Sequence, residues 1–313
     1  MSVITRLFTP PRLSVALEIA AGHVAAVRLG AGAPPAIEAH AVEALPDGAV
    51  VPSLAASNIV DPAAVTAALG RALSGVGGGR HVALVVPDAV AKVSLVRFDQ
   101  VPAKAADLDA MLRWNVRKSL PFKAEDAQMT YGDGALVDGG REFVVASARR
   151  DIIAEYEGVC TAAGVHAGLV DLATFNLVNL QLASASGGGD WLLVHLAADQ
   201  VTLAIVRDRA VIFYRHRGAD GDESLADLVH QTTMYYEDRL GGRGFGRVLV
   251  AGASHGPDSA DGLRRSLEQR LGTQVEAVDP RGVATLADRL GASPELLDRL
   301  AALVGILVRE PAA

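Results

Sequence analysis

The sequence has a single cysteine, Cys160, among 313 residues. One thiol cannot form an internal disulfide or a multi-cysteine metal site, and a lone cysteine is typical of a reducing compartment. Cys160 shares the apolar face of a predicted helix with Ile153 and Tyr156, which indicates a thiol packed in the core. Aromatic residues make up only 4% of the chain, so the core must consist mainly of Ala, Val and Leu.

Basic residues are also in the minority, with 29 Lys and Arg against 36 Asp and Glu and a formal net charge of −7. A nucleic-acid interface needs a basic stripe, whereas acidic and basic residues are interspersed along nearly every segment of this chain. The few aromatic side chains likewise provide no platform on which bases could stack. We therefore expect no nucleic-acid partner.

Long apolar runs are absent. The longest candidate, residues 300–308, stops at Arg309, well short of the roughly 18 to 20 residues that cross a bilayer. Residues 1–12 contain no apolar segment before Pro10 and Pro11, so no secretory signal is expected. These features predict a cytoplasmic protein without a direct membrane span.

The usual metal and nucleotide motifs are missing as well. No two histidines lie three to five residues apart, as helical or finger zinc ligands do; they stand at positions 23, 40, 81, 166, 195, 216, 230 and 255. The glycine clusters at 75–79 and 241–246 match neither the phosphate-binding P-loop nor the dinucleotide fingerprint. We expect solvent loops at both clusters and no dedicated metal site.

One segment of the sequence matches a catalytic pattern. Residues 252–256 read G-A-S-H-G, which matches the G-x-S-x-G turn that presents a nucleophilic serine in hydrolases. That fold places its triad histidine after the serine in the chain, but His255 is the last histidine of this sequence. Because the triad cannot be completed in that order, we exclude a serine hydrolase.

The length allows about two domains at roughly 100 to 200 residues each. In the first part the pattern predicts a strand–turn–strand at 14–29, further strands at 36–42, 81–86 and 90–98, a helix capped by Asp61, and a helix over 101–120 that Pro121 ends. A second α/β region follows, with a strand at 143–148 and helices capped by Asp151 and Asp171. The polar break at 184–189 predicts an interdomain boundary.

Beyond this break the order of elements repeats. Three consecutive strands are predicted at 191–196, 201–206 and 211–214, followed by a helix over 222–240, a strand at 248–251, a helix ending at Gly272, a strand at 275–278 and a last helix from Ser293. Residues 18–24 (EIAAGHV) and 195–201 (HLAADQV) occupy the same strand–turn–strand context in the two halves. This repeat predicts two related α/β domains facing each other across a cleft, although two Ala-rich hairpins can also be similar by chance.

Together these segments resemble the PilM family of type IV pilus assembly proteins, and more distantly the cell-division protein FtsA and the cytoplasmic part of the type II secretion L component. The most specific stretch is 101–126, where a helix leads to Leu120-Pro121-Phe122 and then to an acidic pair, before the strand that contains Tyr131. Residues 143–176 and 301–308 are also similar. The resemblance implies an α/β, actin-like (ribonuclease H-like, duplicated) two-domain fold with a small inserted subdomain.

The domain boundaries follow from the same resemblance. Residues 1–87 would form the first part of the first domain, 88–142 the inserted subdomain, and 143–186 the return to the first domain and the crossover. Residues 187–313 would form the second domain, whose last helix could pack back on the first.

Actin-like domains bind ATP and Mg²⁺ at the cleft through two hairpin turns and a third glycine-rich turn, and the resemblance assigns these positions here. They are Glu18, Ala20, Gly22 and His23 in the first turn, His195, Ala197, Asp199 and Thr202 in the second, and Gly252 in the third. The usual Asp, Gly and Ser or Thr residues are largely replaced. Alanine adds a methyl group where phosphate must approach and opposes φ > 0, Asp199 would repel phosphate, and histidine does not hold hydrated Mg²⁺.

These departures lead us to expect no cofactor and a degenerate nucleotide site, while weak ATP binding through Glu18 and shifted backbone contacts stays open. The resemblance also implies docking of the N-terminal cytoplasmic peptide of an inner-membrane PilN-like protein in a groove between the first domain and the inserted subdomain. The matching residues are Arg113, Trp114, Arg117, Leu120, Pro121 and Phe122. Alternatively, Leu120 and Phe122 pack the subdomain, and Arg113 and Arg117 form a solvated helix face.

The sequence leaves two main classes of function open. The first is a scaffold or adaptor of a type IV pilus or related secretion machine, held at the inner membrane by its protein partner, with other pilus proteins or a second copy as further partners. The second is an actin-like ATPase or small-molecule kinase, for which Glu18 is the only acidic residue expected at a phosphate turn. A division or secretion adaptor of similar fold is a third, weaker alternative.

Overall fold

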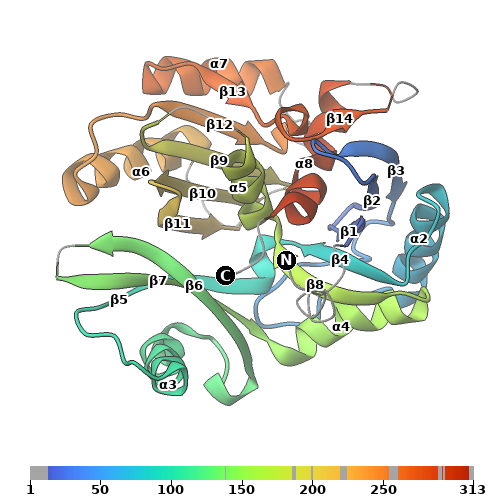
Figure 1. Cartoon of the computed structure of the whole chain (residues 1–313), viewed down its shortest axis with the longest axis horizontal. Helices are drawn as coiled ribbons and strands as arrows, with labels where there is room; N and C mark the ends of the chain where they lie inside the picture. Colours follow the sequence, from blue (N-terminus) through green and yellow to red (C-terminus); the bar gives the residue numbers. More distant parts are fainter. Residues whose placement is uncertain are drawn as a thin grey trace, which may run out of the picture.

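The computed structural model describes residues 13–137, 139–184, 188–198, 200–218, 224–253, 260–287, 291 and 293–309. Three β-sheets form the framework, and two of them are large (Figure 1). None of the described helices is both long enough and apolar enough to cross a membrane.

The first large sheet has the strand order β14-β3-β2-β1-β4-β8. Strands β1, β2 and β3 form an antiparallel meander, whereas β4 runs parallel to β1 and β8 runs parallel to β4. The bounds are β1 (Val15–Ile19), β2 (His23–Leu29), β3 (Ala36–Ala44), β4 (His81–Val86), β8 (His166–Leu172) and β14 (Thr285–Leu286). Helices α2 (Pro62–Gly75) and α4 (Arg150–Ala162) cover one face through the apolar residues of the first core cluster.

The second large sheet repeats this plan in the order β11-β10-β9-β12-β13. Strands β9, β10 and β11 are antiparallel, and β12 runs parallel to both β9 and β13. The bounds are β9 (Trp191–Ala197), β10 (Gln200–Arg207), β11 (Ala210–Arg217), β12 (Arg247–Ala251) and β13 (Val275–Ala277), with helices α6 (Leu225–Leu240) and α7 (Ala260–Leu271). The shared strand order shows that the two halves have the same topology, as the repeated hairpin predicted.

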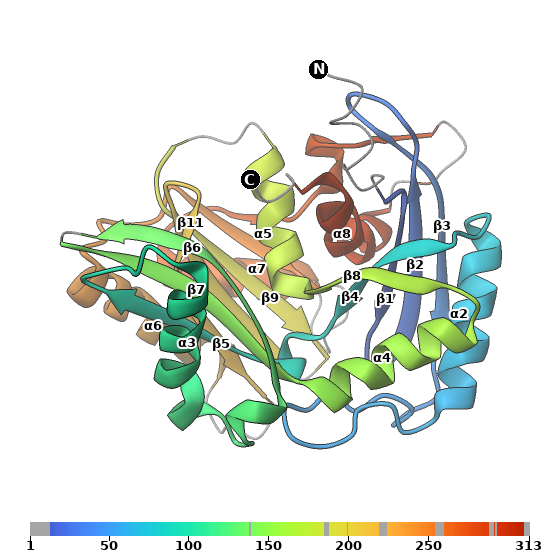
Figure 2. The ribbon, with the colours of Figure 1, turned by 60° about the horizontal axis from the view of Figure 1, so that its bottom comes forward.

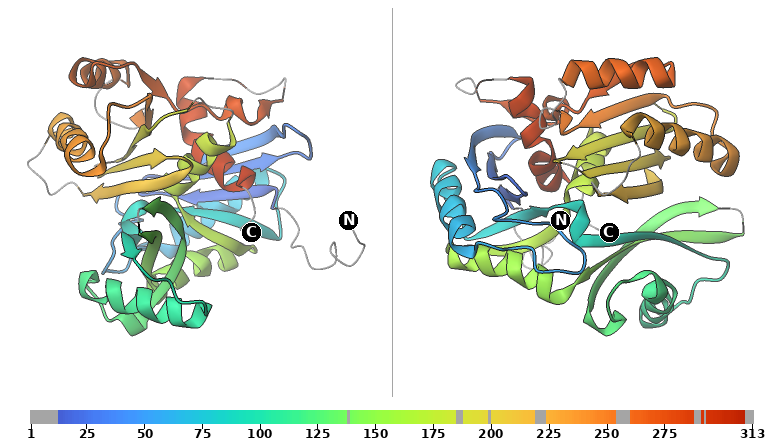
Figure 3. Two further views of the ribbon diagram at one scale, coloured as in Figure 1. Left: turned by 60° about the vertical axis from the view of Figure 1, so that its left-hand side comes forward. Right: turned by 180° about the vertical axis from the view of Figure 1, so that it is seen from behind.

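A third sheet, in the order β5-β7-β6, is inserted between β4 and α4. Its antiparallel strands are β5 (Ala91–Phe98), β6 (Ala127–Val137) and β7 (Gly140–Arg149), and α3 (Ala105–Val116) covers one face at the periphery of the molecule (Figure 3). A separate small core holds α3 on the sheet, formed by Val96, Leu108, Leu112, Val116, Phe143 and Val145. Strands β5 and β6 also contact β11 of the second half.

Helices α5 (Ala173–Ala183) and α8 (Pro294–Val308) lie side by side between the two large sheets (Figure 2). Gly305 makes this close packing possible, because a Cβ atom there would lie 1.9 Å from the carbonyl oxygen of Asn176. Both helices belong to one core cluster with strands of each sheet, and α8 contacts β1 and β2 directly. The core is therefore continuous between the two halves.

Three local predictions differ from the structure. Asp61 caps α2 by accepting from Ala64 N at 2.9 Å, as predicted, but Asp151 and Asp171 cap no helix. Asp151 lies inside the first turn of α4 and pairs with Arg149, while Asp171 still belongs to β8 and pairs with Arg309 at 3.3 Å. The helix predicted over 101–120 is shorter, because a 3-10 turn begins at Arg117.

Candidate functional site

A cleft between the two halves contains a cavity of about 400 Å³. The turn between β1 and β2 lies on one side of it, and the turn between β9 and β10 lies on the other. Glu18, Ala20, Gly22, His23, His195, Ala197 and Gly252 all line this cavity. The structure thus brings together seven of the nine residues that the resemblance assigned to a nucleotide site.

Of the other two residues, Thr202 does not line the cavity. Thr202 is buried on β10, where its hydroxyl donates to Asp88 at 2.8 Å. Asp199 lies outside the described residues, so the expected repulsion of phosphate by this side chain stays a prediction.

The expectation that alanine would prevent a left-handed turn is wrong at one position. Ala198, between β9 and β10, has φ of 52° and lines the cavity. A left-handed conformation costs a non-glycine residue roughly 1 to 2 kcal/mol, and the surrounding hairpin holds Ala198 there despite this strain. Gly22, in the first turn, has no positive φ, and a Cβ atom added there would meet no other atom within 4 Å.

Behind the cavity wall lies a buried acid that the sequence analysis missed, next to the cavity-lining His195. Asp88 follows the buried strand β4 and is 3% exposed. Its Oδ2 lies 3.0 Å from Nδ1 of His195 and accepts from the hydroxyl of Thr174, while its Oδ1 accepts from Thr174 N at 3.1 Å. The position of Asp88 at the carboxyl end of a central parallel strand was the available signal, because ligands of open α/β sheets bind at such ends.

The pKa values indicate an ionic pair. Burial opposes ionisation of Asp88, but hydrogen bonds from His195 and Thr174 and the His195 charge hold the pKa of Asp88 well below its ordinary value. Burial acts to lower the pKa of His195, yet the hydrogen bond and charge of Asp88 raise this pKa above its ordinary value. Each group therefore favours the charged form of the other, carboxylate for Asp88 and imidazolium for His195.

Two further residues missed by the sequence analysis come from α8. Asp298 and Arg299 line the cavity, and Asp298 Oδ1 accepts a 2.7 Å hydrogen bond from the backbone N–H of Gly252. In the first turn, Glu18 Oε2 lies 3.6 Å from His23 Nε2. The cavity lining therefore includes two acidic side chains, Glu18 and Asp298, together with the imidazole of His23 and the guanidinium of Arg299.

The predicted docking residues lie on the inserted subdomain, away from the cleft. Trp114 is 66% exposed on α3, and the guanidinium carbon of Arg117 lies 3.0 Å from the centroid of its indole ring. Arg113 pairs with Asp109 at 2.8 Å. Among the remaining three, Pro121 is exposed, while Leu120 and Phe122 are half-buried.

Leu120 and Phe122 belong to none of the apolar clusters formed by the described residues. The core under α3 is formed by other side chains, so a docking role and a packing role for these two residues both stay predictions. Both side chains are half-buried, so part of each is at the surface.

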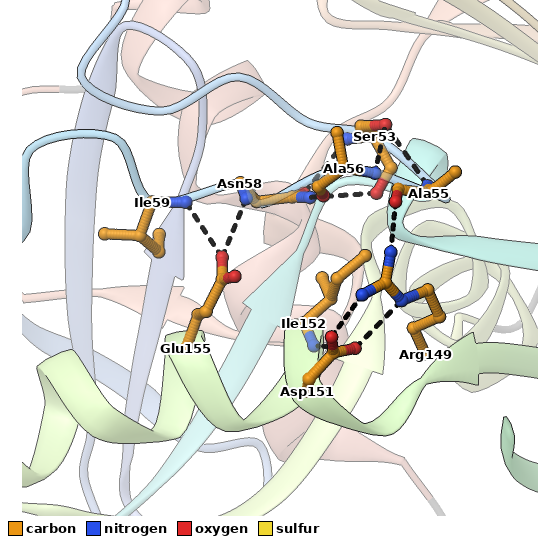
Figure 4. Close-up of polar contacts among 9 residues, drawn as sticks. All are labelled: Ser53, Ala55, Ala56, Asn58, Ile59, Arg149, Asp151, Ile152 and Glu155. Carbon is orange, nitrogen blue, oxygen red and sulfur yellow. Dashed lines mark hydrogen bonds and ion pairs between the residues drawn. The ribbon is translucent and has the colours of Figure 1, made fainter. Parts of the chain in front are cut away.

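A polar cluster joins the loop after β3 to the junction of β7 and α4 (Figure 4). Glu155 Oε2 accepts from Asn58 N at 2.7 Å and from Ile59 N at 3.1 Å, and Arg149 donates to the carbonyl of Ala55. Pro52, in the same loop, lines the cleft. The loop is thus held both at the cleft and at the base of the inserted sheet.

Arg150, which follows Arg149 in the chain, contacts the segment that leads from Phe122 into β6. Its guanidinium lies 3.4 Å from the carbonyl oxygen of Glu125 and 3.5 Å from that of Ala127. Arg149 and Arg150 therefore connect the base of the inserted sheet to the loop of the first half and to the segment that follows Phe122.

The duplicated sheets, the cleft between paired hairpin turns and the inserted third sheet define an actin-like, two-domain α/β protein. The sequence profile of the type IV pilus assembly protein PilM family matches residues 17–240, more than two thirds of the chain. This chain belongs to that family.

Among solved structures, the chain is similar to a PilM–PilN type IV pilus biogenesis complex, with a TM-score of 0.78 and 16% identity over 95% of this chain and 97% of that one. Two weaker likenesses have TM-scores below 0.5. One is the cytoplasmic domain of EpsL, an inner-membrane component of the type II secretion system of Vibrio cholerae, with a TM-score of 0.48 and 11% identity over 75% of this chain and 80% of that one. The other is a Bacteroides thetaiotaomicron protein with an actin-like ATPase fold, with a TM-score of 0.49 and 9% identity over 96% of this chain and 98% of that one. No curated protein sequence matches this chain.

Proposed function

We propose that this PilM-family protein is a cytoplasmic platform of a type IV pilus assembly machine, located at the inner membrane through a PilN-like protein whose N-terminal cytoplasmic peptide it binds. The observation that carries the proposal is the family match over residues 17–240, together with a fold similar to that of a PilM–PilN complex over 95% of the chain. A docking role also agrees with an inserted subdomain that presents apolar and aromatic side chains at its surface.

Trp114 is the proposed centre of the docking surface. Aromatic and arginine side chains dominate the energetics of protein interfaces, and Arg117 stacked on Trp114 orders both groups before binding. The exposed Pro121 and the half-buried Leu120 and Phe122 extend the surface. Arg113, paired with Asp109, marks its border.

The segment that contains Phe122 and the loop at 53–58 define the proposed groove. Arg150 contacts the residues that follow Phe122, through the carbonyls of Glu125 and Ala127. Arg149 contacts the loop through the carbonyl of Ala55, so both contacts start from the junction of β7 and α4. A peptide between them would touch the first domain and the inserted subdomain at once. This arrangement would make binding sensitive to how the two are oriented.

A synthetic peptide of the N-terminal cytoplasmic segment of the PilN-type protein from the same organism tests the proposal by calorimetry. We expect binding to wild type and an affinity loss of about 30-fold or more for Trp114→Ala with Phe122→Ala, the size typical of hot-spot residues. The matched control is Met234→Ala with Tyr235→Ala, which removes exposed side chains from α6 of the second domain. No binding to wild type would refute the function, whereas unchanged binding by the first variant would refute this choice of surface.

We further propose that the cleft does not bind ATP with Mg²⁺. The Gly252 N–H, which could approach a phosphate, is already bonded to Asp298, and both Asp298 and Glu18 bring carboxylates to the cavity. At the second turn His195 is paired with Asp88, and an imidazolium does not coordinate Mg²⁺. The residues present therefore do not fit the nucleotide.

The alternative is an actin-like ATPase, and thermal unfolding separates the two functions. A ligand present at 100 times its Kd adds about 2.7 kcal/mol of stability. We expect no change in Tm with millimolar MgATP, and a clear rise that requires both Mg²⁺ and ATP would support the ATPase.

A further inference from the structure

The Asp88 carboxylate connects the two domains. Asp88 follows β4 of the first domain, while His195 and Thr202 lie on β9 and β10 of the second. His195 Nδ1 lies 3.0 Å from Oδ2 of Asp88, and the hydroxyl of Thr202 donates to the same oxygen at 2.8 Å. Thr174, at the start of the crossover helix α5, also donates to Asp88 through its backbone N–H and its hydroxyl.

All four residues are buried, so their polar groups depend on one another for hydrogen bonds while the domains are in contact. Removing one partner of a buried, hydrogen-bonded charge pair leaves an uncompensated charge and is strongly unfavourable. When the domains separate, water can solvate both groups. The pair therefore favours the closed arrangement most strongly when both charges are present.

Asp88 also lies directly before the inserted sheet in the chain. It begins the 3-10 turn Asp88–Val90, and β5 starts directly after this turn at Ala91. A change in the position of Asp88 is thus transmitted through two residues to the first strand of the subdomain. At the other end of the insertion, Arg149 holds the loop that contains Pro52 of the cleft wall.

Other titratable groups face the pair from each neighbouring element. Glu18 on β1 and Asp298 on α8 act on His195 through their charges, and both favour its protonated form. His216 on β11 contacts Thr202 at 3.0 Å, and burial lowers the pKa of His216 below its ordinary value, so it is neutral near pH 7. Tyr214, also on β11, is neutral because burial raises its pKa well above the ordinary value.

We infer that Asp88 and His195 form an interdomain latch: while their contact is intact the cleft stays closed, and when it is lost the domains separate and the inserted sheet becomes less ordered. The latch needs neither nucleotide nor partner peptide. It therefore goes beyond the docking function and can be tested without it.

The direction of the pH dependence follows from the two shifts. Folding raises the pKa of His195, so its stabilisation is complete below the ordinary value of about 6.5 and is lost as the pH rises through the raised value. Folding lowers the pKa of Asp88, so its stabilisation is present above about pH 4 and is lost as the pH falls through the lowered value. The latch is consequently strongest at about pH 5 to 6 and weakens in alkaline solution.

Two spin labels can measure the distance between the domains in the full chain. Val60→Cys in the first domain and Met234→Cys on α6 provide exposed attachment sites, while the native Cys160 is fully buried. We expect one narrow distance distribution at pH 6 and a broader distribution with a longer component at pH 9. In Asp88→Asn the longer component should be present at both pH values, because the ionic pair is absent.

Thr202→Val keeps the charges and the volume but removes the hydroxyl that bonds to Asp88 and contacts His216. Its control is Thr232→Val, since Thr232 is equally buried but donates only to Leu228 O within α6. Hydrogen exchange of β9 and β5 should rise by about 10-fold in Thr202→Val, the effect of one hydrogen bond to a charged group, and should not change in the control. Equal distance distributions at pH 6 and 9 in wild type, or equal exchange in the two valine variants, would overturn the latch.

Discussion

The backbone N–H of Gly252 donates a 2.7 Å hydrogen bond to Oδ1 of Asp298, which joins the end of β12 to α8 inside the cleft. Gly252 has φ of 76°, and a Cβ atom there would lie 1.8 Å from the carbonyl oxygen of Leu196. The close approach of β12, β9 and α8 at this point therefore requires glycine. The same contact occupies the backbone donor of Gly252.

Gly252→Ala should consequently lower the free energy of unfolding by about 3 kcal/mol or more, because the positive φ and the clash with the Leu196 carbonyl add together. Gly22→Ala is the matched control, since a Cβ atom added at Gly22 would meet no atom within 4 Å and the φ of Gly22 is not positive. That variant should stay within about 0.5 kcal/mol of wild type. Urea unfolding of both proteins provides the comparison, and similar losses in the two would show that the Gly252 turn is not constrained.

Ala198→Gly should raise the free energy of unfolding by up to about 1 kcal/mol. Glycine removes the left-handed strain at φ of 52°, worth roughly 1 to 2 kcal/mol, but makes the unfolded chain more flexible by about 0.4 to 1 kcal/mol. Ala197→Gly, in the extended end of β9, serves as the control and should be destabilising. A loss of stability in Ala198→Gly would contradict the strain assigned to this turn.

Glu155→Ala should destabilise the protein by about 2 kcal/mol, because the backbone N–H groups of Asn58 and Ile59 both lose their acceptor. Hydrogen exchange should increase first in residues 51–60. Glu157→Ala removes an exposed carboxylate from the same helix and should change the stability by less than about 0.5 kcal/mol. If Glu155→Ala behaved like the control, the loop would be held by its other contacts alone.

Cys160 should not react with thiol reagents in the native protein at pH 8. Burial raises the pKa of its thiol to about 12, and the side chain is fully buried against the first core cluster. Because the thiolate is the reactive form, modification should follow unfolding, and its rate should increase with urea as the protein unfolds. Rapid labelling in native buffer would show that α4 opens locally.

Much of the architecture could be predicted from the sequence because it depends on local patterns. Apolar alternation indicated the strands of both meanders, and Asp61 with Pro62 marked the start of α2, where the side chain does cap the helix. Asp151 and Asp171 offered the same local signal, yet their carboxylates pair with Arg149 and Arg309. Capping at these positions was decided by partners that the local pattern does not include.

The candidate site was likewise predicted only in part from the sequence. The repeated hairpins at 18–24 and 195–201 predicted two turns on opposite sides of one cleft, and both turns line the same cavity. The resemblance also pointed to Trp114, whose exposure the structure shows. By contrast, nothing in the sequence paired Asp88 with His195 or Gly252 with Asp298.

The sequence by itself therefore determined the two related α/β halves and the membership in the PilM family, because hydrophobic period, turn residues and motif order are properties of neighbouring positions. The tertiary structure alone decided the charge pairing in the cleft. Asp88 and His195 are separated by 107 residues, and only the closure of two sheets around α5 and α8 buries both groups and makes the carboxylate and the imidazolium stabilise each other.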